Sequence, residues 1–350
     1  MPLAACTTLR LGGPATTFLR ATTATELVEA VRAVDASREP LLLLGGGSNL
    51  VISDSGFAGT VVQVATRGRR ADPLGDGLVQ FTVEAGEDWD SVVAEAVAQG
   101  LGGLECLSGI PGLVGATPVQ NVGAYGIEIS QVLTSVDLLD RRSGSVHQRG
   151  ADSLGLAYRT SVLKGTDHAV VLRARFQLTA GGLSAPIRYA ELARVLGVAQ
   201  GDRVPVEQAR KAVLELRRGK GMVLDAADHD TWSAGSFFTN PLVDDSTLSS
   251  VLIRIAERLG ADVDVPVYPA GPGESKLSAA WLIERAGFGK GHRGPGGRVA
   301  LSGKHTLALT NRGAATTEDL LELAREVRDG VRAAFGVELH PEPVLVGCTF

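Results

Sequence analysis

The segment from Gly109 to Gly126 constrains the fold of this chain more than any other part of the sequence. It places five glycines and two prolines in eighteen residues and carries no charged side chain. A solvated linker would be polar, and a packed helix would not tolerate so many helix-breaking residues. The pattern therefore predicts a backbone that lies against a large, flat, anionic ligand, with N–H groups turned toward phosphate oxygens. A dinucleotide has this shape and charge.

The composition suits a globular protein of several domains that binds its ligand in loops. With 350 residues the chain is long enough for two or three domains. It contains 44 glycines but only 5% aromatic residues, which favours loops that cradle a ligand over a stacked aromatic surface. The formal net charge of −5 argues against a nucleic-acid partner, because such proteins usually carry a basic stripe.

We expect a cytoplasmic protein that does not contact a membrane. The start of the chain lacks the basic region and apolar run of a signal peptide, and no stretch reaches the roughly 18 apolar residues of a membrane span. The three scattered cysteines, Cys6, Cys106 and Cys348, are too few for a disulfide framework or a zinc site. We therefore expect reduced thiols. The histidines show no metal-ligand spacing, so no metal is predicted.

Helix and strand signals alternate along the chain. Apolar residues recur at helical spacing in some segments and form short buried runs in others. The predicted helices are 25–34, 89–99, 206–218, 246–260, 276–287 and 317–335, the last capped by Thr317. The predicted strands are 40–45, 59–64, 78–85, 135–140, 169–178 and 306–310. The polar, turn-rich segment 67–77 is interpreted as a domain boundary, and a second boundary is placed near residue 220.

A second glycine-rich loop, Gly-Gly-Gly-Ser-Asn at 45–49, directly follows the predicted strand 40–45. Many folds bind phosphates at this position. The loop is neither a G-x-G-x-x-G fingerprint nor a Walker loop, because the next residues continue as strand and no Lys-Ser/Thr pair follows. A glycine-rich hairpin is the alternative. We favour two loops that converge on one ligand. The polar side chains that would then contact a pyrophosphate or a flavin edge are Ser48, Asn49, Gln120 and Asn121.

Three further motifs carry side chains suited to catalysis. Arg159 lies between two predicted strands, where it would either form a surface ion pair or bind a substrate carboxylate with its planar guanidinium. Ser236 stands between a glycine and two phenylalanines, outside any G-x-S-x-G motif. Its hydroxyl would either donate a proton to a developing carbanion or bond to the backbone of a turn. Glu342 is held between two prolines, as a positioned carboxyl group or as part of a terminal strand edge.

Taken together, these motifs resemble those of the UDP-N-acetylenolpyruvoylglucosamine reductase family. The likeness runs in order from about residue 7 to residue 347. The glycine tract alone would indicate only the wider superfamily of flavoproteins with an FAD domain of the vanillyl-alcohol-oxidase type. The additional Arg, Ser and Glu motifs narrow the resemblance to the reductase. The segments that carry it are 45–49, 108–126, 158–159, 235–241 and 341–343.

The resemblance implies an α+β fold with a two-part FAD-binding domain of the vanillyl-alcohol-oxidase type and a separate α+β substrate-binding domain. FAD-binding subdomain 1 would span 1–70, with 336–350 returning toward the active site. Subdomain 2 would span 71–219, and the substrate-binding domain 220–335. FAD would be noncovalent, because neither glycine loop contains a histidine or cysteine for attachment. The residues implied to bind FAD are Gly45, Gly46, Gly47, Ser48, Asn49, Leu50, Ser108, Gly109, Ile110, Pro111, Gly115, Ala116, Gln120, Asn121, Gly123, Ala124, Tyr125 and Gly126.

The implied activity is the FAD-mediated reduction of UDP-N-acetylglucosamine enolpyruvate to UDP-N-acetylmuramate, with NADPH as co-substrate, in peptidoglycan precursor synthesis. Hydride would pass from flavin N5 to C3 of the enolpyruvyl group, and Ser236 would give a proton to C2. Arg159 and Glu342 would stabilise the carboxylate as negative charge spreads onto it. Glu342 would have to carry or share a proton, because a bare carboxylate would repel the intermediate.

The resemblance also implies contacts to the nucleotide-sugar substrate. The segment 186–189 resembles the tyrosine-bearing loop that closes over the substrate in the longer subgroup of the family. Residues 220–225 lack the proline-rich form expected there, and the roles of His305 and Lys290 stay open. We expect a monomer. The implied substrate-binding residues are Tyr158, Tyr189, Lys220, Asn240, Tyr268 and Lys276.

Two other functions remain as alternatives. An FAD-linked hydroxy-acid or alditol oxidase would share the FAD domain, but it would lack the Gly-Ser-Phe-Phe motif at 235–238 and the terminal glutamate, and would reduce oxygen rapidly. A flavoprotein that acts only as a binding or sensor module would show no turnover.

Overall fold

The computed structural model describes residues 1–350, which fold into two compact units. Unit 1 comprises Met1–Pro14, Gly47–Phe57 and Leu224–Phe350, and unit 2 comprises Ala15–Gly46 and Ala58–Val223. Both contain helices and sheets, so the predicted α+β class is confirmed. The division into three domains expected from the sequence stays a prediction. None of the helices is long and apolar enough to cross a membrane.

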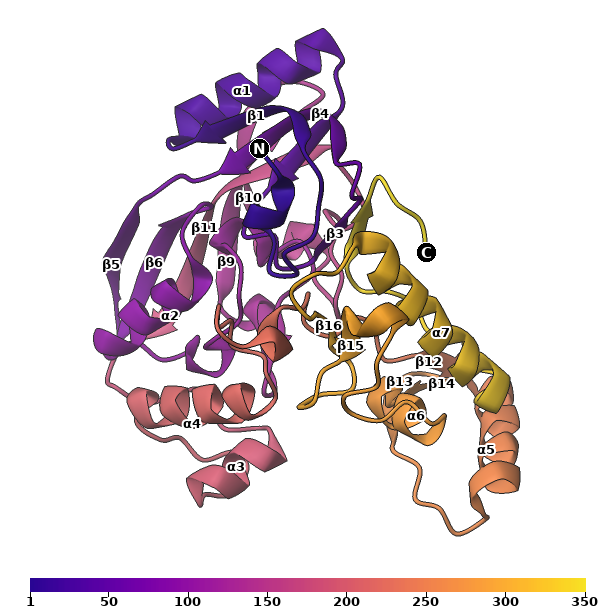
Figure 1. Ribbon diagram of the computed structural model, residues 1–350. Coiled ribbons are helices and arrows are strands. Elements are labelled where there is room, and N and C mark those ends of the chain that lie inside the picture. The colour runs from indigo at the N-terminus through magenta and orange to yellow at the C-terminus, as the bar shows by residue number, and fades with distance from the viewer. The chain divides into compact units, whose positions relative to one another are not determined.

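Two sheets form the framework of unit 2 (Figure 1). The five-stranded antiparallel sheet has the order β10-β9-β11-β6-β5. Its strands are β5 (Arg69–Gly75), β6 (Leu78–Glu84), β9 (Leu133–Asp140), β10 (Val146–Gly150) and β11 (Ala169–Thr179). The three-stranded sheet has the order β1-β4-β2, with β1 (Ala15–Ala21), β2 (Leu41–Leu44) and β4 (Phe57–Val64). A small hairpin of β7 (Gly123–Ala124) and β8 (Ile127–Glu128) begins inside the glycine tract.

The polar segment 67–77, interpreted from its sequence as a turn-rich boundary, is mostly the strand β5. It is polar because it forms the edge of the five-stranded sheet and pairs only with β6. The turn to β6 is made by Asp76 and Gly77, whose φ angles are 51° and 73°. An Asp-Gly pair between two strands is a strong hairpin signal, so the sequence contained the information that was missed.

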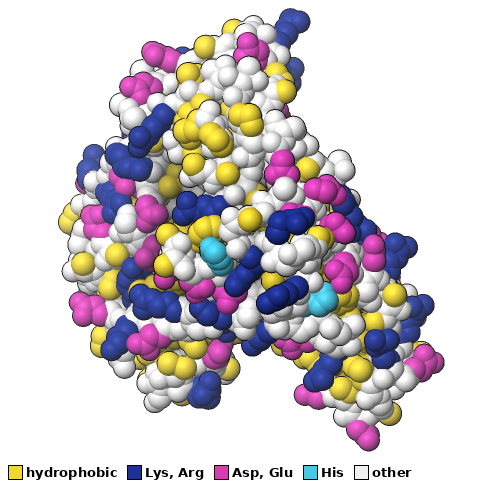
Figure 2. Space-filling model, viewed as in Figure 1, with side chains coloured by type: hydrophobic (Ala, Val, Ile, Leu, Met, Phe, Trp, Pro, Cys, Tyr) yellow, Lys and Arg dark blue, Asp and Glu magenta, His cyan; other side chains and the backbone are white.

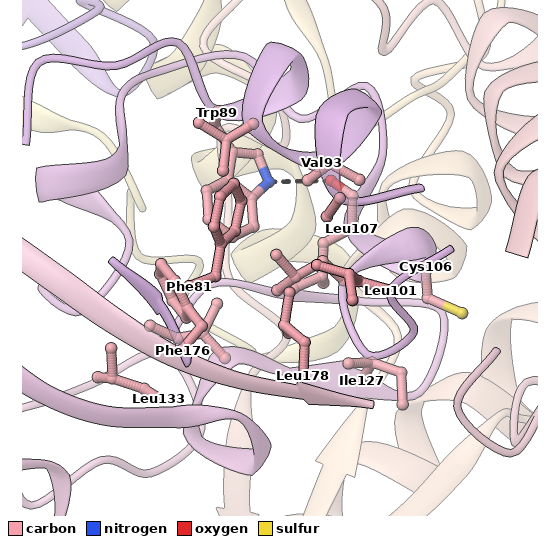
Figure 3. Close-up of a cluster of buried hydrophobic side chains, with 14 of the residues drawn as sticks. Phe81, Trp89, Val93, Leu101, Cys106, Leu107, Ile127, Leu133, Phe176 and Leu178 are labelled. Carbon is pink, nitrogen blue, oxygen red and sulfur yellow. Dashed lines mark hydrogen bonds between the residues drawn. The ribbon is translucent and has the colours of Figure 1, made fainter. Parts of the chain in front are cut away.

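Four helices pack in unit 2. They are α1 (Ala24–Ser37), α2 (Trp89–Ala98), α3 (Ala190–Leu196) and α4 (Val206–Gly219). Helix α1 contributes to a smaller core, and α2, α3 and α4 contribute to the largest one. Trp89 is fully buried and meets Phe176 of β11 edge to face, with ring centroids 5.8 Å apart (Figure 3). Its indole N–H donates to the carbonyl of Leu107 at 3.0 Å. This core therefore joins the sheet, α2 and the start of the glycine tract.

Unit 1 contains three small sheets and three helices. β3 (Leu50–Ile52) pairs in parallel with β17 (Val344–Val346), so the C-terminal segment lies beside the strand that follows the Gly-Gly-Gly-Ser-Asn loop. The remaining strands are β12 (Leu242–Asp244), β13 (Val267–Gly271) and β14 (Glu274–Leu277) in one sheet, and β15 (Val299–Leu301) and β16 (Leu309–Asn311) in another. The helices are α5 (Asp245–Leu259), α6 (Ala279–Arg285) and α7 (Thr317–Phe335).

Helix α7 spans the predicted residues, but its cap is Thr316 rather than Thr317. The Thr316 side chain accepts from the N–H of Asp319, and the Asp319 carboxylate accepts from the N–H of Thr316. Two other predictions are corrected. The predicted helix 276–287 begins as strand β14 and becomes α6 after the Ser278 cap. The predicted strand 306–310 is displaced to β16.

Charged side chains of both signs are scattered over the visible surface among uncharged and hydrophobic ones. In Figure 2, Lys and Arg stand beside Asp and Glu over much of the face in view. Some of these charges are paired within each unit. Arg69 pairs with Glu87 at 2.7 Å in unit 2, and Arg312 pairs with Asp230 at 2.7 Å in unit 1.

Candidate functional site

The two glycine-rich loops approach each other within unit 2. A Cβ atom on Gly46 would lie 2.8 Å from the Cα of Gly112, which is too close for any side chain. Gly45 faces the side chain of Leu113. The end of strand β2 and the start of the glycine tract therefore present main chain to each other, as expected for loops that converge.

The continuation of the first loop lies in unit 1 and is equally crowded. Gly47 has a φ of +60°, and a Cβ there would lie 2.0 Å from the carbonyl oxygen of Cys6. The main-chain N–H groups of Gly47 and Ser48 donate to no carbonyl of the chain. The Asn49 carbonyl accepts from the N–H of Val344 at 2.9 Å. The loop is thus fixed by its surroundings while two adjacent N–H groups stay available to an anion.

Several N–H groups of the glycine tract are used by the fold itself. The N–H of Gly115 donates to the carbonyl of Ala85 at 2.9 Å, and a Cβ on Gly115 would lie 2.7 Å from the Cβ of Ala85. The N–H of Val114 donates to the carbonyl of Glu87 at 3.0 Å. These donors are not directed at a ligand. In this part of the tract, glycine is needed because the tract packs closely on the end of strand β6.

Asp90 of α2 fixes the start of the tract. Its carboxylate accepts from the N–H of Gly109 at 2.6 Å and from Arg210 of α4 at 2.6 and 2.9 Å. Burial disfavours the charged form of Asp90, but the hydrogen bonds from Arg210 and Gly109 outweigh it and hold the pKa below the usual value. No local pattern in the sequence indicates this residue, because its partners lie 19 and 120 positions away.

Arg217, near the end of α4, is a further residue that the sequence did not single out. Its Nη2 donates to the carbonyl of Met222 at 2.9 Å, whereas its Nε is buried and has no hydrogen-bond partner. A Cβ on Gly109 would lie 3.3 Å from this Nε. Burial lowers the pKa of Arg217. A guanidinium group in such surroundings favours the arrival of an anion.

Three predicted ligand-binding residues gather where the tract meets α3 and α4. The rings of Tyr125 and Tyr189 are 5.4 Å apart and nearly perpendicular. Lys220, at the end of α4, pairs with Glu191 of α3 at 2.8 Å. Burial disfavours the charged form of Lys220, but the bond to Glu191 outweighs it and raises the pKa. Burial also raises the pKa of Tyr125. This part of unit 2 therefore offers phenol groups and an ammonium group close together.

Arg159 lies at the tip of a tight turn in which Ala157 and Thr160 exchange main-chain hydrogen bonds of 3.2 and 3.1 Å. Its φ is 52°, a left-handed conformation that is unfavourable for a residue with a side chain. Its Nη2 donates to the carbonyl of Gly123 at 2.9 Å. The guanidinium also lies over the ring of Tyr158, 5.4 Å from its centroid. The turn therefore places both predicted residues next to the glycine tract.

Ser236 and Glu342 belong to neighbouring backbone segments of unit 1 although they are far apart in the sequence. The N–H of Glu342 donates to the carbonyl of Phe237, the residue after Ser236, at 2.8 Å. Phe238 and Pro341 form a bridge beside this bond. The rings of Phe237 and Phe238 are buried, which anchors the segment. The structure thus places one hydroxyl group and one carboxyl group on adjacent backbone segments.

The other predicted substrate residues lie around the sheet of β12, β14 and β13, also in unit 1. Tyr268 and Lys276 are register partners in β13 and β14. The Oδ1 of Asn240 accepts from the N–H of Ala279 at 3.0 Å, at the start of α6. Tyr268 is about half exposed, with an accessible fraction of 49%. These three residues belong to unit 1, while Arg159, Tyr189 and Lys220 belong to unit 2.

Family models match both parts of the chain. A model described as an FAD binding domain matches residues 15–150. A model described as UDP-N-acetylenolpyruvoylglucosamine reductase, C-terminal domain, matches residues 227–346. The first match contains the two glycine-rich loops and the second contains Ser236 and Glu342.

The chain is also similar over its whole length to curated proteins named UDP-N-acetylenolpyruvoylglucosamine reductase. The protein from Saccharopolyspora erythraea is 70% identical over 346 residues, which cover 99% of this chain and 94% of that protein. The protein from Thermobifida fusca is 57% identical over 350 residues, which cover 100% and 98%. Among solved structures, the UDP-N-acetylenolpyruvylglucosamine reductase (MurB) from Thermus caldophilus superposes with a TM-score of 0.67 at 26% identity, covering 99% of this chain and 97% of that one.

Proposed function

The chain belongs to the UDP-N-acetylenolpyruvoylglucosamine reductase family, and on this premise we propose how its residues carry out the reaction. The protein is an FAD-dependent reductase of peptidoglycan precursor synthesis that converts UDP-N-acetylglucosamine enolpyruvate to UDP-N-acetylmuramate, with NADPH as the electron donor. When bound, FAD would supply the hydride-transfer chemistry that links NADPH to the enolpyruvyl group.

The residues of the glycine-rich loops fit FAD. Gly46 and Gly112 approach so closely that Gly46 does not tolerate a Cβ, which brings the two glycine-rich loops together. The buried Nε of Arg217 beside Gly109 lacks an acceptor, which the phosphates of a dinucleotide could supply. We propose that the predicted loop residues hold FAD noncovalently, except for the Asn121 side chain and the N–H groups of Gly109 and Gly115, which the fold itself uses. The N–H groups of Gly47 and Ser48 are among the proposed donors.

We propose that Ser236 donates the proton to C2 while Arg159 and Glu342 face the substrate carboxylate. A cation and a proton-sharing carboxyl group lower the energy of the negative charge that develops on the carboxylate after hydride reaches C3. The observation that carries this assignment is the hydrogen bond from the N–H of Glu342 to the carbonyl of Phe237, because it joins the two backbone segments that bear the unit 1 residues.

The substrate diphosphate and uridine are proposed to contact predicted substrate-binding side chains of unit 1 and of unit 2. Lys220 offers a positive charge next to Tyr125 and Tyr189, and Lys276 offers another beside Tyr268. Asn240 and Tyr158 complete the proposed set. Two cations and several phenol or amide groups suit a nucleoside diphosphate, which needs charge for its phosphates and hydrogen bonds for its base.

The test separates the two half-reactions by stopped-flow absorbance of the flavin. In a Ser236→Ala variant, NADPH should reduce the flavin at the wild-type rate. Reoxidation by UDP-N-acetylglucosamine enolpyruvate should slow by about 10² to 10⁴-fold, because general acid catalysis contributes on that order. A Thr239→Val variant, which removes a hydroxyl from the same segment, should reoxidise normally.

Normal reoxidation in Ser236→Ala would remove the serine from the mechanism. If NADPH bleaches the wild-type flavin and the enolpyruvyl nucleotide fails to restore its absorbance, the proposed reaction is wrong. Rapid reoxidation by oxygen alone would favour the oxidase alternative.

We also propose that the protein is a cytoplasmic monomer. Its three cysteines form no disulfide, which suits a reducing compartment. Cell fractionation and light scattering after size-exclusion chromatography test the two statements separately.

A further inference from the structure

We propose that Asn121 of the glycine tract positions the turn that carries Arg159, so that the segment predicted to bind the cofactor also sets the place of the substrate-carboxylate contact. This inference rests on the proposed function, since Arg159 is the residue that the positioning would serve. Asn121 is a positioning residue here, because it acts through Arg159.

The side chain of Asn121 is largely used by the fold. It is fully buried. Its Nδ2 donates to the carbonyl of Ala157 at 3.1 Å and to Oε2 of Glu128 at 2.7 Å, and its Oδ1 accepts from the N–H of Ser130 at 3.1 Å. Both amide protons are therefore occupied, and one acceptor position remains. The Asn121 side chain has nothing left to donate to a ligand.

Ala157 is the first residue of the turn whose tip carries Arg159. Ala157 and Thr160 bond to each other through their main chains, so a shift of the Ala157 carbonyl moves the whole turn. Further bonds connect the same two segments. Ser161 donates to the carbonyl of Val119 at 2.6 Å, and Arg159 donates to that of Gly123 at 2.9 Å. In the bond from Asn121, a side chain of the tract holds the backbone of the turn.

Both ends of this connection have unusual backbone conformations. Asn121 has a φ of 46° and Arg159 a φ of 52°. Residues other than glycine hold such angles only where the surrounding contacts enforce them. Asparagine is among the residues that adopt this conformation most readily, and its amide also supplies two donors at one position. Asparagine therefore suits position 121 in two ways, since it tolerates the positive φ and donates both hydrogen bonds.

Three variants test the proposal. In Asn121→Asp, a carboxylate would face the Ala157 carbonyl and the Glu128 carboxylate, so both donated bonds are lost and the turn shifts. In Glu128→Gln, the side chain still accepts from Asn121 and the turn should stay in place. In the double variant, the amide introduced at position 128 can donate to the carboxylate introduced at position 121. This restores the bond between these two side chains with its polarity reversed, but not the bond to the Ala157 carbonyl.

The kinetic expectation concerns the second half-reaction. Asn121→Asp should slow flavin reoxidation by the enolpyruvyl substrate by about 10- to 100-fold, because small displacements of a positioning group have effects of this size. Flavin reduction by NADPH should stay within about twofold of wild type. Glu128→Gln should match the wild type, and the double variant should stay as slow as Asn121→Asp, because the Ala157 carbonyl still lacks its donor. Recovery in the double variant would overturn the proposal, since it would trace the loss to repulsion by Glu128 and not to the turn.

A double-mutant cycle shows whether Asn121 acts through Arg159. In an Arg159→Met background, Asn121→Asp should change reoxidation by less than about twofold. Full additivity of the two substitutions would overturn the proposal, since a general structural defect would add to the loss of Arg159.

Hydrogen exchange of the FAD-loaded protein tests the positioning without any substrate. In Asn121→Asp, the peptide covering 157–164 should exchange faster than in the wild type and in Glu128→Gln, whereas the N–H of Ser130 keeps its acceptor. Unchanged hydrogen exchange in the peptide 157–164 would overturn the inference, whether or not the proposed function is correct. Faster exchange in a protein whose flavin the substrate fails to reoxidise would support the positioning and reject the proposed function.

Discussion

At the scale of single residues, backbone strain is concentrated where the ligand is proposed to bind. Six residues other than glycine have a positive φ, and three of them are Asn121, Tyr125 and Arg159. Of the others, Arg38 ends the helix α1, and Asp76 lies in the hairpin turn between β5 and β6. Strain of this kind costs on the order of 1–3 kcal/mol per residue and persists where the surroundings enforce it. Its distribution singles out the glycine tract and the Arg159 turn independently of any motif.

The contact between Gly46 and Gly112 leads to a prediction for Gly46→Ala. The added methyl group would meet the main chain of Gly112 at 2.8 Å, so the loops must separate. We expect a loss of about 1–3 kcal/mol in the free energy of unfolding, typical of overpacking, and weaker FAD binding. Gly150→Ala is the matched control, because a Cβ there meets nothing within 4 Å. Equal FAD dissociation constants for both variants, measured by flavin fluorescence, would contradict the prediction.

Arg217→Met separates stability from ligand binding. In the FAD-free protein the substitution removes a buried guanidinium group whose Nε has no acceptor, so the melting temperature should stay the same or rise. Affinity for FAD should fall by about 10- to 100-fold, because a charge-assisted hydrogen bond is lost. Thermal melting of the FAD-free protein and titration with FAD provide the two values. A destabilised protein with normal affinity would show that Arg217 is structural.

At the scale of elements, the sequence predicted long segments well and short polar ones poorly. The helix α7 and the strand β11 match the predicted ranges because their apolar periodicity is long. The hairpin β13–β14 and the edge strand β5 were missed, since few of their residues are buried and pairing rather than composition makes them strands. Such elements become visible only when their partners are known.

The N-terminus of α7 leads to a prediction for pH dependence. The hydrogen bond from Arg298, despite the opposing effect of burial, holds the pKa of Asp319 well below its usual value. A depressed pKa contributes stability above the unfolded-state pKa of about 4, and the contribution is lost as the pH falls below it. Asp319→Asn should therefore lower the free energy of unfolding by about 1–2 kcal/mol at pH 7. The difference from wild type should shrink as the pH falls through about 3.

Urea unfolding at several pH values measures this effect. Asp329→Asn is the control, because its ion pair with Arg328 is exposed on the Asp329 side and should contribute little. A difference between Asp319→Asn and wild type that stays constant from neutral pH down to the acid limit of the native state would contradict the ionic origin of the stabilisation.

At the scale of the whole molecule, the sequence supplied the residue types of the site but not its contacts. The motifs led to Arg159, Ser236 and Glu342, and the family resemblance assigned their roles. No local pattern shows that Glu342 bonds to the backbone beside Ser236, or that Asn121 holds the turn of Arg159, because those partners are distant in the chain. Asp90 and Arg217 were missed for the same reason. Charged residues on helices are usually solvated, and only their contacts with the tract distinguish these two.

FAD should stabilise the whole protein because it binds the native state. At a free FAD concentration of about 100 times the dissociation constant, the expected gain is about 2.7 kcal/mol. FAD-free protein should therefore melt a few degrees lower than the holoprotein and recover on addition of FAD. The purified protein should be yellow, and acid precipitation should release all flavin into the supernatant. Flavin retained in the precipitate would mean covalent attachment.

The bond between the N–H of Glu342 and the carbonyl of Phe237 has a consequence for inhibitors. Together with the bridge of Phe238 to Pro341, it keeps the serine segment and the terminal segment at a fixed spacing. A competitive compound cannot widen that spacing without breaking the main-chain hydrogen bond from Glu342 to the segment of the buried Phe237 and Phe238. Compact carboxylates no broader than the enolpyruvyl group are therefore better starting points than bulky ones, which would have to gain affinity from the nucleotide end.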